Sequence, residues 1–149
     1  MITIQKNHIS QYHIDTKKIK AGIETTLELH QKSGVEIVLR LTDNEEITKL
    51  NQQFRGLTEP TDVLSFNHDF INPETNQLYL GDIIISLETA MAQAQEHKHS
   101  LTDECLLLSI HGTLHLLGYD HDILTEEKEM WLMQENIQQI VEKKLQGRS

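Results

Sequence analysis

Three histidines lie within a stretch of eleven residues that reads HGTLHLLGYDH, from His111 through His115 to His121. A helix is predicted over residues 102–117, so His111 and His115 share one of its faces, with Cβ atoms about 6 Å apart. Imidazoles at this spacing can hold one divalent ion between them. Gly118 suits the left-handed conformation that ends helices, after which the chain can bring His121 toward the same point. The pattern therefore predicts a metal ion bound by three imidazoles.

This ligand set is typical of a catalytic rather than a structural metal centre. Three protein ligands leave a fourth position around zinc for water, whereas structural zinc is closed by four protein ligands. Three imidazoles also suit nickel and copper, so the residues alone leave the identity of the ion open.

Gly112, which directly follows the first histidine, indicates which reactions a metal centre at this position could catalyse. The same histidine spacing occurs in a class of zinc proteases, which carry a glutamate at this position as the general base. Glycine in its place argues against peptide hydrolysis. A glycine inside a helix also costs up to about 1 kcal/mol relative to alanine. We therefore expect another part of the molecule, or a ligand, to approach the backbone closely at Gly112.

Composition limits the class of protein. The chain has 149 residues, of which 38% are hydrophobic, and its formal net charge is −10. This length corresponds to one domain, residues 1–149, that is large enough to bury its own core. The acidic charge argues against a protein that coats nucleic acid by bulk electrostatics, but it leaves room for a local phosphate site.

The number of cysteines and the hydrophobic pattern of the sequence indicate the cellular compartment of the protein. Cys105 is the single cysteine, so no internal disulfide can form, and we expect this thiol to lie in the core. The first residues lack the pattern of a signal peptide, and no apolar run approaches the roughly 20 residues of a membrane helix. We expect a protein of the reducing cytoplasm with no membrane partner.

Hydrophobic periodicity and turn residues predict the order β-α-β-α-β-β-α-α-α. This order is typical of an α/β (α+β) fold in which helices pack on a small mixed sheet. The predicted strands are 2–6, 35–41, 62–66 and 80–86, and the predicted helices are 15–31, 43–53, 87–98, 102–117 and 124–145. The helix over 43–53 is expected to begin at Asp43, with Glu46 three residues later, and to bury Ile47, Leu50 and Phe54.

Three segments of the chain together resemble a known family. They are the histidine motif at 111–121, the pair NQQFRG at 51–56 with TDVLSF at 61–66, and GDIIIS at 81–86. In order and spacing they resemble the YbeY family of bacterial, metal-dependent endoribonucleases. The resemblance extends across the whole domain, and the chain departs from the family pattern at residues 67–68, where relatives often have proline.

The resemblance implies a function that spacing does not show. His111, His115 and His121 would bind one zinc ion per chain, and Arg55 would be the functionally important arginine of the family. The substrate would be single-stranded RNA, in the 3′ end maturation of small-subunit ribosomal RNA and in ribosome quality control. Partners would be the small ribosomal subunit and its assembly factors. A planar, permanently charged guanidinium suits Arg55 to bind phosphate oxygens in a bidentate way.

Several alternatives stay open at this point. The nucleophile can be a metal-activated water or the 2′-hydroxyl of the RNA. Another metal-dependent hydrolase, acting on a peptide or small amide, and a ribosome-associated binding module with structural zinc are competing functions. Asp62 and Asp82 could cap strands or pair with Arg55, and Asp120 could orient a ligand imidazole. His97 and His99 are expected to be exposed.

Overall fold

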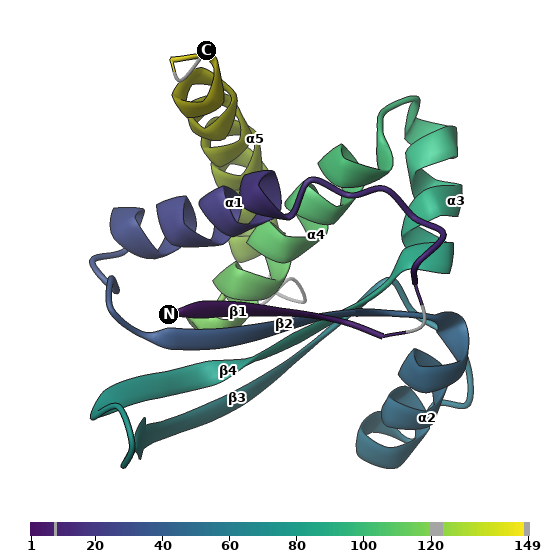
Figure 1. Cartoon of the computed structure of the whole chain (residues 1–149), viewed down its shortest axis with the longest axis horizontal. Coiled ribbons are helices and arrows are strands. Elements are labelled where there is room, and N and C mark those ends of the chain that lie inside the picture. Colours follow the sequence, from purple (N-terminus) through teal and green to yellow (C-terminus); the bar gives the residue numbers. More distant parts are fainter. Residues whose placement is uncertain (8, 120–123, 148–149) are drawn as a thin grey trace.

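A computed structural model describes residues 1–7, 9–119 and 124–147 (Figure 1). The predicted order of elements is confirmed in this α/β fold. The elements are β1 (Ile2–Lys6), α1 (Thr16–Leu29), β2 (Glu36–Thr42), α2 (Asn44–Arg55), β3 (Val63–Asn72), β4 (Gln77–Ser86), α3 (Leu87–His97), α4 (Leu101–Leu116) and α5 (Leu124–Gln146).

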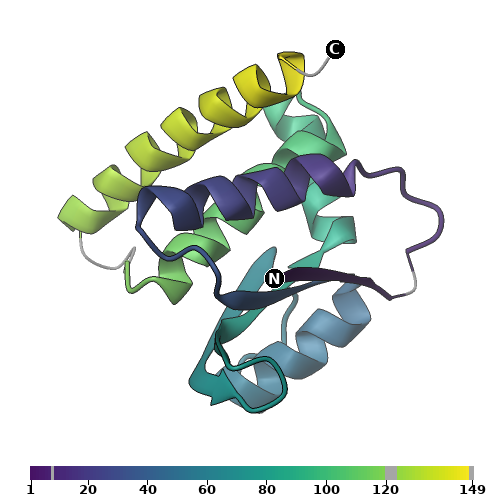
Figure 2. The same ribbon diagram turned by 60° about the vertical axis from the view of Figure 1, so that its left-hand side comes forward.

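The four strands form one mixed sheet in the order β1-β2-β4-β3. β1 and β4 both pair with β2 in parallel, and β3 pairs with β4 as an antiparallel hairpin. β3 is therefore an edge strand, although it lies between β2 and β4 in the sequence. α2 lies on one side of the sheet, and the other four helices gather on the opposite side (Figures 1 and 2).

Alternating side chains of the sheet bury two separate sets of hydrophobic residues. Ile83 and Ile85 of β4 face the main core beneath α1, α3 and α4. Ile84, between them in sequence, faces the other way and packs with Ile47 of α2 and Leu64 of β3. This alternation explains why β4 reads as an almost continuous apolar run, because both faces of the strand are covered.

The hairpin formed by β3 and β4 is longer than predicted. The sequence indicated strands over 62–66 and 80–86, whereas the observed strands are Val63–Asn72 and Gln77–Ser86. The outer part of β3 was missed because its side chains are largely exposed, so no hydrophobic alternation marks it. The pairing is also irregular between Asn67 and Phe70, and Asp69 there has a φ of 50°.

α2 begins as predicted but buries less than predicted. The side chain of its N-cap, Asp43, accepts a hydrogen bond from the Glu46 amide at 2.9 Å. Ile47 is fully buried, but Phe54, which the helical pattern also assigns to the buried face, is 59% exposed. Its ring packs instead against Phe66 of β3, with the centroids 5.0 Å apart.

α4 is the central helix of the molecule and is packed against other elements on most of its surface. It contacts α1, α3 and α5, and it also lies on β3 and β4. Cys105 is fully buried in this helix, as expected. Burial, together with the neighbouring Glu104 charge, raises the pKa of the Cys105 thiol to about 12. A buried thiol with a raised pKa is poorly suited to act as a nucleophile.

A single lysine joins three of the helices around this core. Lys18 of α1 forms ion pairs with Asp103 of α4 at 2.8 Å and with Glu142 of α5 at 2.6 Å. Burial opposes the charged ammonium, but the hydrogen bonds and charges of the two carboxylates outweigh it and raise the pKa of Lys18. In the part of the chain that the structure describes, no helix is both long and apolar enough to span a membrane.

Candidate metal centre

His111 and His115 point toward a common position beside α4. Their Nε2 atoms lie 3.0 Å apart, and the ring centroids are separated by 4.6 Å with the planes inclined at 75°. Two nitrogens bound to one tetrahedral zinc ion at 2.0–2.1 Å would be about 3.3 Å apart. The donor types and their separation therefore fit a single zinc ion with little adjustment.

Gln134 of α5 orients the first of these imidazoles. Its Oε1 lies 3.1 Å from Nδ1 of His111, and the Gln134 side chain is buried. With Nδ1 donating this hydrogen bond, Nε2 carries the lone pair that a metal requires. Gln134 was not predicted from the sequence. A signal was present, because Gln134 interrupts the apolar stripe formed by Met130, Ile137 and Val141.

The turn that follows α4 has the geometry expected from Gly118. This residue has a φ of 107°, and its amide donates to the His115 carbonyl at 3.0 Å. The next amide, that of Tyr119, donates to the Leu114 carbonyl at 3.1 Å. This pair of bonds satisfies the last carbonyls of the helix and directs the chain away from its axis. His121 lies outside the described residues, so its place in the centre stays a prediction.

The sheet is the part of the molecule that approaches Gly112 closely. A Cβ atom at this position would lie 2.8 Å from Cγ2 of Ile83 and 3.1 Å from Oγ of Ser65. The Ser65 hydroxyl donates a hydrogen bond to the Gly112 carbonyl at 3.3 Å. The missing side chain thus lets α4 rest directly on β3 and β4, and the expected close approach is confirmed.

Gly112→Ala is expected to destabilise the protein by about 1–2 kcal/mol. Overpacking costs about 1–3 kcal/mol, and the better helix propensity of alanine returns up to about 1 kcal/mol. Urea unfolding followed by circular dichroism measures the difference. Gly147→Ala, where the new Cβ would be 3.5 Å from its nearest neighbour, is the matched control and should change stability by less than about 0.5 kcal/mol. A more stable Gly112→Ala variant would contradict this explanation.

Arg55 lines the same cleft as the two histidines. It is the last residue of α2 and is exposed. The cleft has a volume of about 620 Å³ and passes along β3 from the end of α2 to α4. Its lining consists of Phe54, Arg55, Thr61, Asp62, Val63, Leu64, Ser65, Phe66, Asn67, His111 and His115. The structure therefore places Arg55 and both described histidines at one site.

Asn51 holds the loop that forms one wall of this cleft. The residue is buried, and its Nδ2 donates to the Glu59 carbonyl at 2.9 Å. This bond fastens the segment after Arg55 to the helix that carries it. No role for Asn51 was predicted from the sequence.

The aspartates that could have paired with Arg55 form other hydrogen bonds. The carboxylate of Asp62 accepts from the Val63 amide at 2.8 Å and from Nε2 of Gln93 at 3.3 Å. Asp82 bonds to Nε2 of His68 at 2.9 Å and accepts from the hydroxyl of Tyr79. In the described structure both carboxylates are therefore engaged with partners other than Arg55, and Asp120 lies outside the described residues.

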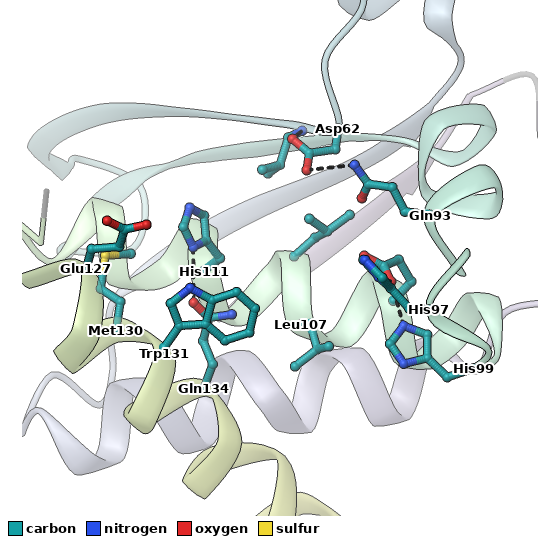
Figure 3. Close-up of a pocket in the computed structure, with 13 residues that line it drawn as sticks. Asp62, Gln93, His97, His99, Leu107, His111, Glu127, Met130, Trp131 and Gln134 are labelled. Atoms are coloured by element: carbon teal, nitrogen blue, oxygen red, sulfur yellow. Dashed lines mark hydrogen bonds and ion pairs between the residues drawn. The ribbon is translucent and has the colours of Figure 1, made fainter. Parts of the chain in front are cut away.

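A second cavity, of about 460 Å³, lies on the other side of His111, between α3, α4 and α5 (Figure 3). His97, His99 and Glu104 gather at the end of this cavity away from His111. The side chain of His97 is 54% exposed, as expected, but that of His99 is half-buried against Glu104. No sequence pattern groups these three residues.

Comparison with known proteins gives a consistent result. A family model described as endoribonuclease YbeY matches residues 4–142. A protein of that name from Roseiflexus sp. (strain RS-1) is 44% identical over 116 residues, which cover 74% of this chain and 72% of the relative. Another, from Acholeplasma laidlawii, is 36% identical over 135 residues and covers 90% of this chain and 94% of its own length.

A solved structure is also similar over nearly the whole chain. The solution structure of TM1509 from Thermotoga maritima has a TM-score of 0.64 and is 29% identical in sequence. The match covers 99% of this chain and 93% of the other. The likeness supports the same overall fold.

Proposed function

Because this chain belongs to the endoribonuclease YbeY family, we propose that it is a metal-dependent endoribonuclease that cleaves single-stranded RNA. The observation that carries this proposal is the meeting of Arg55, His111 and His115 in one cleft. The physiological reaction is the 3′ end maturation of small-subunit ribosomal RNA, with a role in ribosome quality control. We propose further that residues 1–149 act as a single domain in the cytoplasm, with the small ribosomal subunit and its assembly factors as partners.

His111, His115 and His121 are the proposed ligands of one zinc ion. A zinc ion held there supplies Lewis acidity, which polarises a phosphoryl oxygen and lowers the pKa of a coordinated water. The chain itself orients the first of these ligands, because Gln134 sets the tautomer of His111. The turn at Gly118 follows the helix that carries both described histidines.

Arg55 is the proposed phosphate-binding residue. Negative charge on the phosphoryl oxygens grows as the reaction approaches its transition state, and a guanidinium in the cleft stabilises that charge. Its planar fork can bond two phosphate oxygens at once, which also fixes the orientation of the scissile group. Both the RNA 2′-hydroxyl and a water molecule remain available as nucleophile. A 2′,3′-cyclic phosphate on the product would identify the 2′-hydroxyl.

The proposal is tested by incubating the purified protein with labelled single-stranded RNA, the matching duplex and casein. Cleavage of the single strand alone, lost on adding a chelator and restored by zinc, is the expected result. Proteolysis of casein without cleavage of RNA would overturn the proposal. That alternative is disfavoured because position 112, where the zinc proteases with this histidine spacing carry their glutamate base, is a glycine packed closely against Ile83 and Ser65.

Gln134→Ala is expected to weaken zinc binding by about 10–100-fold, because loss of the hydrogen bond leaves the His111 ring poorly oriented. Competition with a chromogenic chelator measures the affinity. Gln139→Ala, at an exposed position on the same helix, is the control and should leave zinc binding unchanged. Equal affinities of the two variants would show that Gln134 does not position the ligand.

A further inference from the structure

His97, His99 and Glu104 form a second cluster of metal-binding groups, separate from the centre at His111. One ligand atom from each of the three lies within 4.8 Å of the others. Oε1 of Glu104 is 3.1 Å from Nδ1 of His97 and 2.5 Å from Nε2 of His99. Two imidazoles and one carboxylate thus converge on a small volume at the wall of a cavity (Figure 3).

The charge of this cavity favours a cation. Glu104 is 4% exposed, and a buried carboxylate is costly unless a positive charge compensates it. Asp62 and Glu127 also line the cavity, whereas none of the described lining residues is lysine or arginine. The region is therefore negative and offers Glu104 only the two imidazoles or a bound cation as compensation.

Local structure holds the three ligands in place. His97 is the last residue of α3, and Lys98 after it adopts a left-handed conformation with a φ of 60°. The chain enters α4 at once, because the Ser100 hydroxyl caps this helix by accepting from the Asp103 amide at 3.0 Å. The tight connection therefore sets both histidines against the first turn of α4, which carries Glu104.

We propose that His97, His99 and Glu104 bind a second divalent transition-metal ion of the zinc type. Two imidazoles and a carboxylate are a known zinc ligand set, whereas magnesium and calcium prefer ligands that are all oxygen. The opening of the cavity leaves space for water to complete the coordination. This ion is additional to the one expected at His111.

The position of the cluster indicates a structural role. Glu104 and His111 are seven residues apart on α4, which corresponds to about 10 Å along the helix axis. Two ions that act on one phosphate lie only about 3.5–4 Å apart. The second ion therefore fastens the end of α3 to the beginning of α4 and takes no part in the cleavage step. The proposal is independent of the ribonuclease activity.

Metal titration of the full chain tests the proposal. Protein freed of metal with a chelator is titrated with Co²⁺, followed by its visible absorption, and with Zn²⁺ against a chromogenic chelator. Two equivalents are expected to bind to the unaltered chain, and one to a variant carrying both His111→Ala and His115→Ala. In that variant, saturating Zn²⁺ should raise the Tm by roughly 5 °C. Mg²⁺ should have no such effect.

Single substitutions identify the ligands of the second ion. His97→Ala is chosen because His97 is the most exposed of the three residues. This substitution should weaken the affinity for the second equivalent of metal by at least about tenfold. Glu104→Gln, which keeps the shape but removes the charge, should act in the same direction. His13→Ala, at an exposed position elsewhere, is the control and should still bind two equivalents.

Two results would overturn the proposal. In the first, the unaltered chain binds a single equivalent of metal, and the variant carrying His111→Ala and His115→Ala binds none. In the second, the His97→Ala variant binds both equivalents with the same affinity as the unaltered chain. RNA cleavage, measured on the same samples, should persist in zinc-saturated His97→Ala protein. If the protein did not cleave RNA, the number of metal ions bound per chain would be unchanged. The proposed function and the proposed second metal site can therefore be refuted independently.

Discussion

Replacing both His111 and His115 by alanine is expected to reduce kcat/KM for cleavage of single-stranded RNA by about a thousandfold or more. Each imidazole places Nε2 at the common position where the ion is proposed to bind. A Lewis-acidic metal contributes several kcal/mol to transition-state stabilisation, and about 1.4 kcal/mol corresponds to a factor of ten in rate. Initial rates on a labelled oligonucleotide, measured with and without added zinc, give this quantity.

The loss must be separated from a failure to fold. Both histidines are only half-buried, so the double variant should keep its circular dichroism spectrum and unfold cooperatively in urea. His13→Ala, which removes an exposed histidine elsewhere, should retain full activity. A folded double variant that cleaves RNA at the original rate, with or without zinc, would refute the assignment of the centre.

Arg55→Ala is expected to lower kcat by about 100–1,000-fold and to leave stability within about 0.5 kcal/mol. The side chain is exposed at the end of α2 and contributes little to packing, so its effect should appear in catalysis alone. Arg55→Lys keeps the charge but loses the bidentate fork, and it should recover only part of the rate. Single-turnover rates at saturating RNA measure the effect on the chemical step.

Lys49→Ala is the matched control for Arg55. Lys49 is exposed on the same helix and pairs with Glu45 at 3.5 Å, outside the cleft. Its replacement removes the same formal charge and should change the rate by less than about twofold, since exposed charges at a distance are screened by salt. Equal losses in the two variants would mean that Arg55 acts through general charge and not by contact with the phosphate.

Local sequence patterns predicted the parts of the structure that are determined by interactions between residues close in sequence. The order of the elements, the N-cap at Asp43 and the turn at Gly118 follow from periodicity and from short-range hydrogen bonding. The outer half of β3 and the exposure of Phe54 were missed, because both depend on which strand pairs with β4 and which side chains cover it.

The candidate site also combines a part that local spacing predicts with a part that depends on the tertiary fold. The helix carrying the motif places His111 beside His115, so four-residue spacing was sufficient to predict their proximity. Arg55 belongs to a helix on the opposite side of the sheet, and only the family resemblance singled it out (Figure 1). It shares a cleft with the histidines because β3 is an edge strand along which that cleft runs, and no local sequence pattern contains the strand order.

The central position of α4 has a consequence for the motions of the protein. Segments with few packing partners open independently, whereas a helix enclosed by three others and a sheet opens only when the whole cooperative unit does. His111 and His115 therefore keep their mutual geometry in every partly open state that leaves this unit intact. Arg55, at the exposed end of α2, belongs to a less protected region. One wall of the cleft, formed by α4, is therefore held rigidly, whereas the wall that carries Arg55 can fluctuate while the protein stays folded.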